Sequence, residues 1–125
     1  MGTKLILWVT TINDDIHGYA VGLKRELEIL EEEKFLEVNK VTIKKFYEDN
    51  LLRGIGKPRL IKLVLVMRMI AKVLDKPFQE ATIDDIKRVV RYIDEFPSWR
   101  PWTKVTHKAV LKKFYKWIGR KRNSV

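Results

Sequence analysis

Residues 50–62 read NLLRGIGKPRLIK, and this segment predicts the end of one helix, a tight turn and the start of another helix. Gly54 and Gly56 allow positive φ angles or a close approach of the backbone to a ligand. Pro58 suits the first turn of a helix, where its missing N–H is no loss. The basic residues of the turn are Arg53, Lys57, Arg59 and Lys62, with no acidic residue among them. Such a helix start favours an anion such as phosphate, and it equally fits a plain connection with solvated charges.

Hydrophobic periodicity on both sides of this turn predicts an all-α domain. Apolar residues recur at helical spacing over about 40–53, 58–74, 83–96 and 103–118. The helix over 58–74 is apolar nearly all round, so we expect it in the middle of the fold. A further helix is expected to begin at Asp14 or Asp15 and to extend through Leu30. The prediction is therefore a bundle of four core helices with an additional N-terminal helix.

Several residues mark where these helices begin and end. Asn39 is a good N-cap for the helix over 40–53, and Gly119 is expected to end the last helix. Thr82 and Asp85 have the spacing of a capping box. Residues 97–102 contain two prolines and are expected to form an ordered loop before the last helix.

Composition indicates a globular protein with an acidic partner. The chain has 125 residues, is 46% hydrophobic and 34% charged, and carries a formal net charge of +10. Such a positive charge favours nucleic acid as the partner. There is no cysteine, so the sequence predicts no disulfide and a cytoplasmic location. The apolar start, Leu5–Val9, is too short for a signal peptide or a membrane span, so we expect no membrane partner.

Charge divides the chain into two parts. Residues 1–37 contain 4 Lys/Arg against 8 Asp/Glu, a net of −4, whereas residues 38–125 contain 22 against 8, a net of +14. We therefore expect an acidic N-terminal segment over 1–37 and a basic helical domain over 38–125. Within the acidic segment, the glutamates between 26 and 33 are expected to face solvent, and Lys4–Thr11 has the composition of a short strand.

The last helix combines an apolar face with a basic one. Its lysines at i, i+4 spacing are Lys104, Lys108, Lys112 and Lys116. Like charges at this spacing repel by a few tenths of a kcal/mol per pair, which a bound anion would relieve. From Arg100 to the end there are 9 basic residues and no acid. This face is expected to contact DNA or RNA, with a merely solvated lysine face as the alternative. His107 points toward the apolar side and is expected to pack there.

Four segments carry a family resemblance: NKVTIKKF at 39–46, GIGKPRL at 54–60, KPFQEATIDDI at 76–86 and WRPWTKVTHKAVLKKFYKWI at 99–118. In this order they resemble the core-binding, SAM-like domain of the tyrosine recombinases, the phage-integrase superfamily, in its archaeal form. The resemblance implies a four-helix core-binding bundle that covers one face of duplex DNA. It also implies that a separate catalytic recombinase domain, or further copies of this chain, share the DNA.

The catalytic residues of that family have no counterparts here. The family's catalytic half carries an Arg, a His-x-x-Arg box and a nucleophilic Tyr, whereas His107 is followed by Lys108-Ala109-Val110 and Tyr115 belongs to the helix pattern. We expect no catalysis by this chain alone, no cofactor and no metal site. We also expect it to be part of a DNA integration or recombination system. The residues expected to contact DNA are Arg53, Lys57, Arg59, Lys62, Arg100, Lys104, Lys108, Lys112 and Lys116.

Two alternatives stay open. The glycine turn also resembles a helix-hairpin-helix motif, which binds DNA phosphates through backbone N–H groups, although Leu60 stands where a small residue is usual. A helical protein-interaction module is the second alternative, because the acidic helix has an apolar face that a partner could cover. A P-loop is excluded, since Leu51 and Pro58 stand where Gly and Ser or Thr are needed. The chain's only histidines, His17 and His107, and its lack of Cys give no ligand set for a metal hydrolase.

Overall fold

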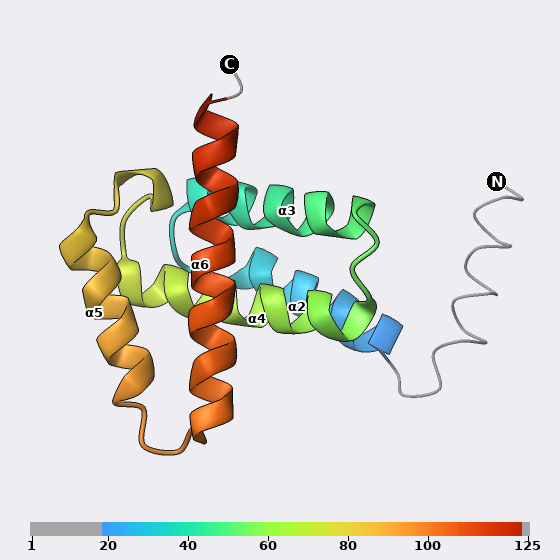
Figure 1. Ribbon diagram of the computed structural model, residues 1–125. Coiled ribbons are helices and arrows are strands. Elements are labelled where there is room, and N and C mark those ends of the chain that lie inside the picture. Colours follow the sequence, from blue (N-terminus) through green and yellow to red (C-terminus); the bar gives the residue numbers. More distant parts are fainter. Residues whose placement is uncertain (1–18, 124–125) are drawn as a thin grey trace, which may run out of the picture.

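Helix α4 (Lys57–Leu74) is the element around which the other helices pack. The computed structural model describes residues 19–123. The other elements are α2 (Tyr19–Glu32), α3 (Glu37–Leu52), the short 3-10 helix η1 (Phe78–Glu80), α5 (Ile83–Asp94) and α6 (Pro101–Asn123). No strand occurs between residues 19 and 123, so the fold is all-α, as predicted (Figure 1).

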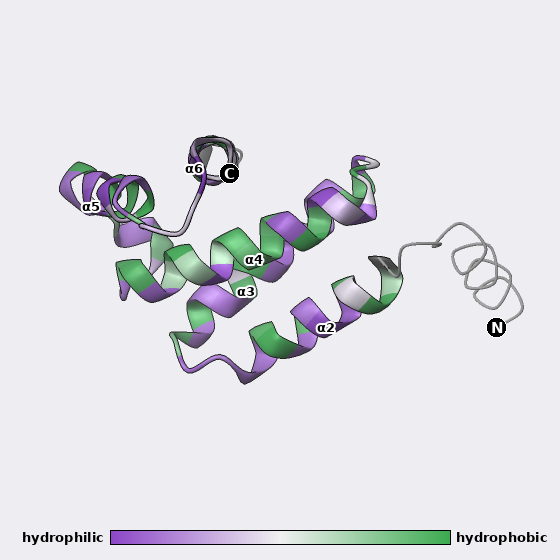
Figure 2. Cartoon of the chain, turned by 90° about the horizontal axis from the view of Figure 1, so that it is seen from below, coloured by the Kyte–Doolittle hydropathy of each residue, from purple (hydrophilic) through white to green (hydrophobic). Residues whose placement is uncertain are grey.

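The helices lie in layers on both sides of α4. Helix α2 covers one side, and α5 and α6 cover the other (Figure 2). Helix α3 runs antiparallel to α4 and is joined to it by the glycine turn, while α6 crosses both of them (Figure 1). The prediction that the helix over 58–74 lies in the middle is therefore confirmed. No helix of residues 19–123 is long and apolar enough to cross a membrane.

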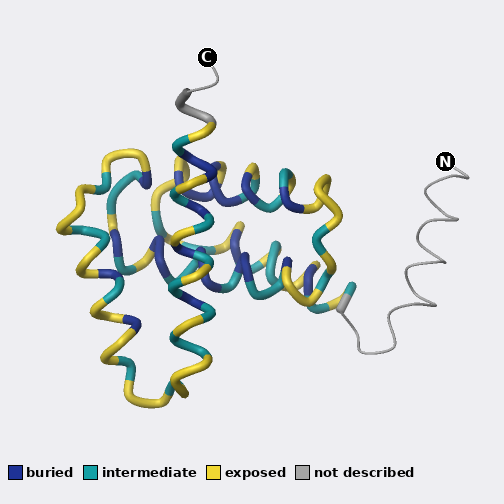
Figure 3. The backbone as a smooth tube through the Cα atoms, in the orientation of Figure 1, coloured by how far each residue is buried: buried dark blue, intermediate teal, exposed yellow. Residues whose placement is uncertain are grey.

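Apolar side chains of α4 form most of the core. Its buried members are Leu60, Leu63, Val64, Val66, Met67, Ile70, Ala71 and Leu74. Burying one such side chain contributes about 1.5–3 kcal/mol. Aromatic rings complete the core, because the Phe114 ring lies 5.1 Å from Phe46 and 4.7 Å from Phe78, centroid to centroid. Figure 3 shows that the buried positions gather where α3, α4 and α6 face each other.

The turn between α3 and α4 is a Schellman motif. The Gly54 N–H donates to the Leu51 carbonyl at 3.0 Å, and the Ile55 N–H donates to the Asn50 carbonyl at 3.1 Å. Gly54 has φ 85°, a conformation that costs other residues free energy. Gly56 differs from the expectation, because it caps α4 with an ordinary φ of −69°. Of these two glycines, only Gly54 has a backbone conformation that requires glycine.

The start of α3 differs from the prediction. The helix begins at Glu37 after the N-cap residue Leu36, so Asn39 is not the cap. Asn39 is fully buried, donates to the Lys76 carbonyl at 2.9 Å and accepts from the Phe78 N–H at 3.0 Å. Its amide therefore connects α3 to the segment after α4, a partner about 37 residues away that local sequence does not indicate.

Two glutamates of the acidic segment are not solvated, contrary to expectation. Arg68 on α4 pairs with Glu26 at 2.7 Å and with Glu33 at 3.0 Å, and Lys72 also reaches Glu33 at 3.0 Å. Burial alone would raise the pKa of Glu33, but hydrogen bonds from Lys72 and Arg68 outweigh it and lower the pKa. Acidic α2 is thus held on α4 by charge as well as by apolar contact.

Predictions for the first residues of the chain and for the boundary between its two parts remain predictions. The short strand expected at Lys4–Thr11 and the start of the first helix at Asp14 or Asp15 lie outside the described residues. The boundary between residues 37 and 38 stays a prediction; it falls in the first turn of α3, and α2 before it packs on α4.

Helices α5 and α6 confirm one expected boundary and correct two others. Thr82 and Asp85 form the predicted capping box at the start of α5. Helix α6 begins at Pro101 rather than Thr103 and continues through Gly119 to Asn123. It therefore includes the end of the predicted loop.

The rest of that loop is ordered by ring stacking, as Phe96 stacks on Trp99 and Trp99 packs on His107, each pair with centroids 4.1 Å apart. Leu51 of α3 and Ile83, the first residue of α5, are apolar but exposed. Lys40 of α3 is buried, and its ammonium donates to the Glu31 carbonyl at 2.9 Å.

Replacing Gly54 by Ala should destabilise the fold by about 1–2 kcal/mol, because alanine is strained at positive φ. Denaturant unfolding followed by circular dichroism measures the change. Gly56→Ser is the matched control: serine is a good N-cap, and its Cβ would meet Pro58 Cδ at an ordinary 3.8 Å. The control should keep or slightly raise stability. Equal losses in the two variants would contradict the Schellman assignment.

Acid should weaken the start of α5. The ammonium of Lys76, 2.8 Å from Asp85 Oδ2, and the Thr82 N–H lower the pKa of Asp85 from 3.8 to about 2. A depressed folded-state pKa stabilises the fold above the unfolded pKa, and this contribution disappears as pH falls from about 4 to about 2. Thermal unfolding against pH should therefore show a shallower decline over this window in Asp85→Asn than in the parent chain. Identical slopes would contradict the assignment.

Candidate nucleic-acid interface

A shallow groove of about 290 Å³ lies between the first half of α4 and the middle of α6. Its lining residues are Ile55, Arg59, Lys62, Leu63, Thr106, Ala109, Val110 and Lys113. Leu63 is buried and Ile55 and Val110 are partly buried, whereas Arg59 is exposed. The α4–α6 groove thus combines an apolar lining with cations supplied by both helices.

Four cations gather at this groove, and we call Arg53, Arg59, Lys62 and Lys113 the cation cluster. Burial lowers the pKa of Lys113, and the nearby charges of Arg53 and Arg59 lower it further. None of the four forms an ion pair with a carboxylate of the described residues. The cluster therefore concentrates positive charge that no acid of this part of the chain neutralises. A bound anion would relieve this repulsion.

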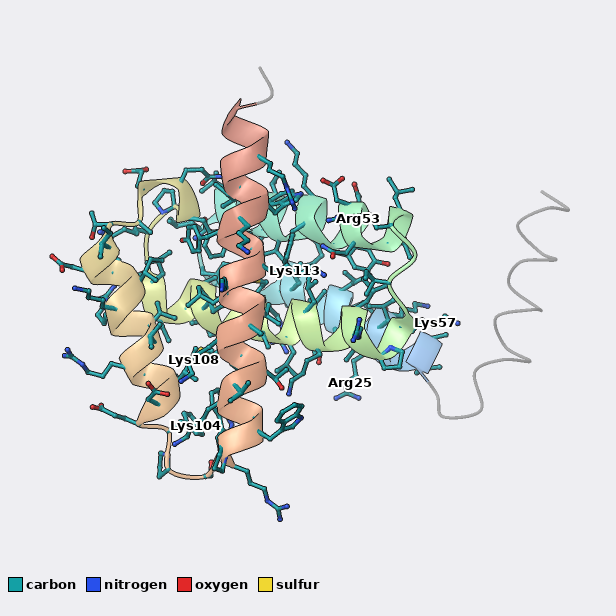
Figure 4. All side chains as sticks on the ribbon, in the orientation of Figure 1. Arg25, Arg53, Lys57, Lys104, Lys108 and Lys113 are labelled. Carbon is teal, nitrogen blue, oxygen red and sulfur yellow. The ribbon has the colours of Figure 1, made fainter. Side chains whose placement is uncertain are left out.

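The lysine row predicted on α6 is divided by the fold. Lys108 pairs with Asp94 Oδ1 at 2.7 Å, and the Lys104 ammonium donates to the Asp94 carbonyl at 2.6 Å. Figure 4 shows both lysines on the side of α6 that faces α5, and Lys113 on the other side, toward Arg53. Lys104 and Lys108 are thus engaged at the end of α5 and lie away from the cation cluster.

The remaining predicted contact residues are spread over the surface. Lys57 lies on a different groove, between α2 and α3, where Glu28 and Glu48 are also present. Arg100, Lys112 and Lys116 are exposed. Of the nine residues predicted to contact DNA, the structure brings Arg53, Arg59 and Lys62 together, and contact by the others stays a prediction.

Lys113 lines the groove although it was not among the residues predicted to contact DNA. Lys113 falls outside the i, i+4 lysine row of α6, and its neighbours Arg53 and Arg59 are more than 50 positions earlier in the chain. Its place between the apolar face and the lysine row indicates partial burial. No local pattern indicates which helix its charge faces, so only the packing of α6 across α4 reveals it.

His107 and Tyr115 are both held by backbone carbonyls. His107 is buried as predicted, with Nδ1 2.8 Å from the Thr103 carbonyl oxygen, and its pKa is lowered chiefly by burial. The Tyr115 hydroxyl donates to the Phe78 carbonyl at 3.1 Å. Burial, with the charge of Asp85, raises the pKa of Tyr115 to about 12. A phenol in this environment is a poor nucleophile near neutral pH, because the phenolate is the reactive form. The described residues contain no group of three or more His, Asp or Glu that could hold a metal ion.

We compared the chain with known protein families, curated proteins and solved structures. The chain matches no family model, no curated protein and no solved structure. The geometry and charge of the α4–α6 groove therefore carry its functional interpretation.

Proposed function

We propose that this chain is a non-catalytic DNA-binding module that contacts duplex DNA through the cation cluster and the exposed lysines of α6, Lys112 and Lys116. The convergence of Arg53, Arg59, Lys62 and Lys113, none paired with a carboxylate of the described residues, carries the proposal. A nucleic-acid backbone supplies closely spaced negative charges, and neutralising them releases counterions, which drives binding.

The start of α4 adds to the positive potential of this surface. No side chain caps its first N–H groups, and its first turn contains no acidic residue. The helix macrodipole places about half a positive charge at such an end. Exposed Lys112 and Lys116 extend the positive surface along α6. Charge from the dipole, the cation cluster and α6 therefore favours the same kind of ligand.

The biological role follows from the family resemblance. The segments that resemble the core-binding domain of tyrosine recombinases include both sides of the α4–α6 groove, at 54–60 and 99–118. We infer a role in DNA integration or recombination in the cytoplasm, in which a separate catalytic recombinase domain, or further copies of this chain, bind the same DNA. The all-α fold with α3 to α6 around one core supports this assignment.

A helix-hairpin-helix mode of binding is the second candidate. The observation that favours it is the hairpin itself: α3 and α4 are antiparallel helices joined by the Schellman turn at Gly54 (Figure 1). In this mode the turn binds DNA by itself and α6 takes no part. Lys113 distinguishes the two modes, because it belongs to α6.

Removing charge at the groove should weaken duplex binding. The combination of Arg59→Gln and Lys113→Gln should lower affinity about 30-fold at 0.15 M salt and reduce the salt slope of log K by about 1.8. Fluorescence anisotropy of a labelled duplex across several salt concentrations measures both quantities. The matched control is Lys104→Gln with Lys108→Gln, which removes the same charge from the α5 side of the same helix and should have a much smaller effect.

The outcomes separate the candidates. If the control pair weakens binding as much as the groove pair, the α5 side of α6 contacts DNA as well, and the proposed preference for the cation cluster is wrong. If Lys113→Gln alone changes nothing while Arg59→Gln abolishes binding, the helix-hairpin-helix mode holds. Affinity that does not change with salt would favour a protein-interaction module instead.

The chain alone should neither cleave nor join DNA. Tyr115 has a pKa raised to about 12 and donates to a carbonyl, and no His or Arg set accompanies it in the family's pattern. Incubation with a labelled duplex, followed by denaturing electrophoresis, tests for a covalent adduct. An adduct that disappears in Tyr115→Phe would contradict this prediction.

A further inference from the structure

The outward face of α6 carries an exposed tryptophan at one end of the α4–α6 groove. Trp102 is 78% exposed, in the first turn of the helix. Thr106, Ala109 and Lys113 follow it at i+4, i+7 and i+11, so helical geometry places all four on one face. Because Thr106, Ala109 and Lys113 line the groove, Trp102 lies one helical turn beyond its Thr106 end.

Trp102 differs from Trp99 and Trp117 in having no aromatic ring packed against it among residues 20–120. Trp99 stacks with Phe96 and His107, and the Trp117 ring packs against Phe46. Trp102 makes no ring contact within residues 20–120. A single exposed apolar side chain needs no explanation. The combination of a free indole with an apolar, cation-bordered groove on the same helix face does indicate a ligand.

The groove is too small to admit a double helix. Its volume of about 290 Å³ lies at the lower end of small-molecule sites. In an intact duplex the bases stack on each other and are not available to an indole. An unpaired strand offers both groups that this surface needs, because its phosphates match the cation cluster and its bases have free aromatic faces. An acidic peptide matches the cations and lacks the regular array of flat rings.

We propose that Trp102 and the α4–α6 groove form a binding site for an unpaired DNA strand, in which the cation cluster holds the phosphates and a base stacks on the Trp102 indole. This inference rests on the proposed DNA-binding function and adds the form of DNA that is recognised. Exposed strands of this kind occur next to a duplex at gaps, overhangs and strand-exchange junctions.

Affinities for two DNAs test the proposal: a blunt labelled duplex, and the same duplex with a short oligothymidine overhang. The full chain should bind the overhang DNA more tightly. Trp102→Leu should lower its affinity for the overhang DNA about 5- to 150-fold and leave blunt-duplex affinity unchanged. Trp102→Phe keeps an aromatic ring and should retain part of the preference. Tyr92→Leu, at a half-exposed aromatic residue of α5, is the matched control and should retain all of it.

Each result decides between the proposals. Equal affinity of the parent chain for both DNAs, or an equal loss on both in Trp102→Leu, overturns the strand site and leaves salt-sensitive duplex binding in place. Failure to bind either DNA overturns the proposed function as well. Displacement of the overhang DNA by polyglutamate as readily as by oligothymidine, at matched charge concentration, overturns the strand site in favour of an acidic peptide. Because Trp102 is exposed, circular dichroism of the variants should match that of the parent.

Discussion

Burial of α4 on nearly every side is the constraint from which the rest of the structure follows. Even Leu60, in its first turn, is fully buried, as are Met67 and Ile70 farther along. A helix this apolar is stable in water only when other elements cover it. Helices α2, α3, α5 and α6 supply that cover, and their apolar faces are turned inward for this reason. Arg59 and Lys62, near the start of α4, are consequently directed to its rim, beside α6.

Arg68, in the middle of α4, is paired with acids, unlike Arg59 and Lys62 near the start of the helix. Arg68 is largely buried and lies between the carboxylates of Glu26 and Glu33. An unpaired guanidinium at such a position would cost several kcal/mol, so the acidic segment stabilises the fold by neutralising it. Two acids of the acidic segment, Glu26 within α2 and Glu33 directly after it, therefore serve an internal partner.

The fold thereby sorts the basic residues into two classes. Lysines such as Lys40, Lys76 and Lys108 are engaged with nearby acids or carbonyls. The cation cluster has no such partner among the described residues. Burial chiefly, and then the nearby charges of Arg53 and Arg59, lower the pKa of Lys113. Selective neutralisation of this kind turns a uniformly basic composition into one surface with a concentrated field. A nucleic-acid strand bound along this face of α6 would contact the positive charge of Lys113 and the exposed ring of Trp102.

Features that depend on neighbouring residues were determined by the sequence alone. The helical periods, the turn at Gly54 and the capping box of Thr82 and Asp85 are all local, because each is satisfied within about one helical turn. The all-α class and the central place of α4 follow from them, since the side chains on one face must be covered. Arg53, Arg59 and Lys62 also share one turn and helix start in the sequence, and the structure brings these three together. Their contact with DNA stays a prediction.

Other features were decided only when the helices packed. The buried role of Asn39, the pairing of Arg68 with Glu26 and the meeting of Lys113 with Arg53 join residues far apart in sequence. The split of the α6 lysine row also required Asp94 of α5. Periodicity states which residues share a helix face, but the element that covers or faces them depends on the crossing of whole helices. That crossing is set by the summed packing of the core, which no single segment encodes.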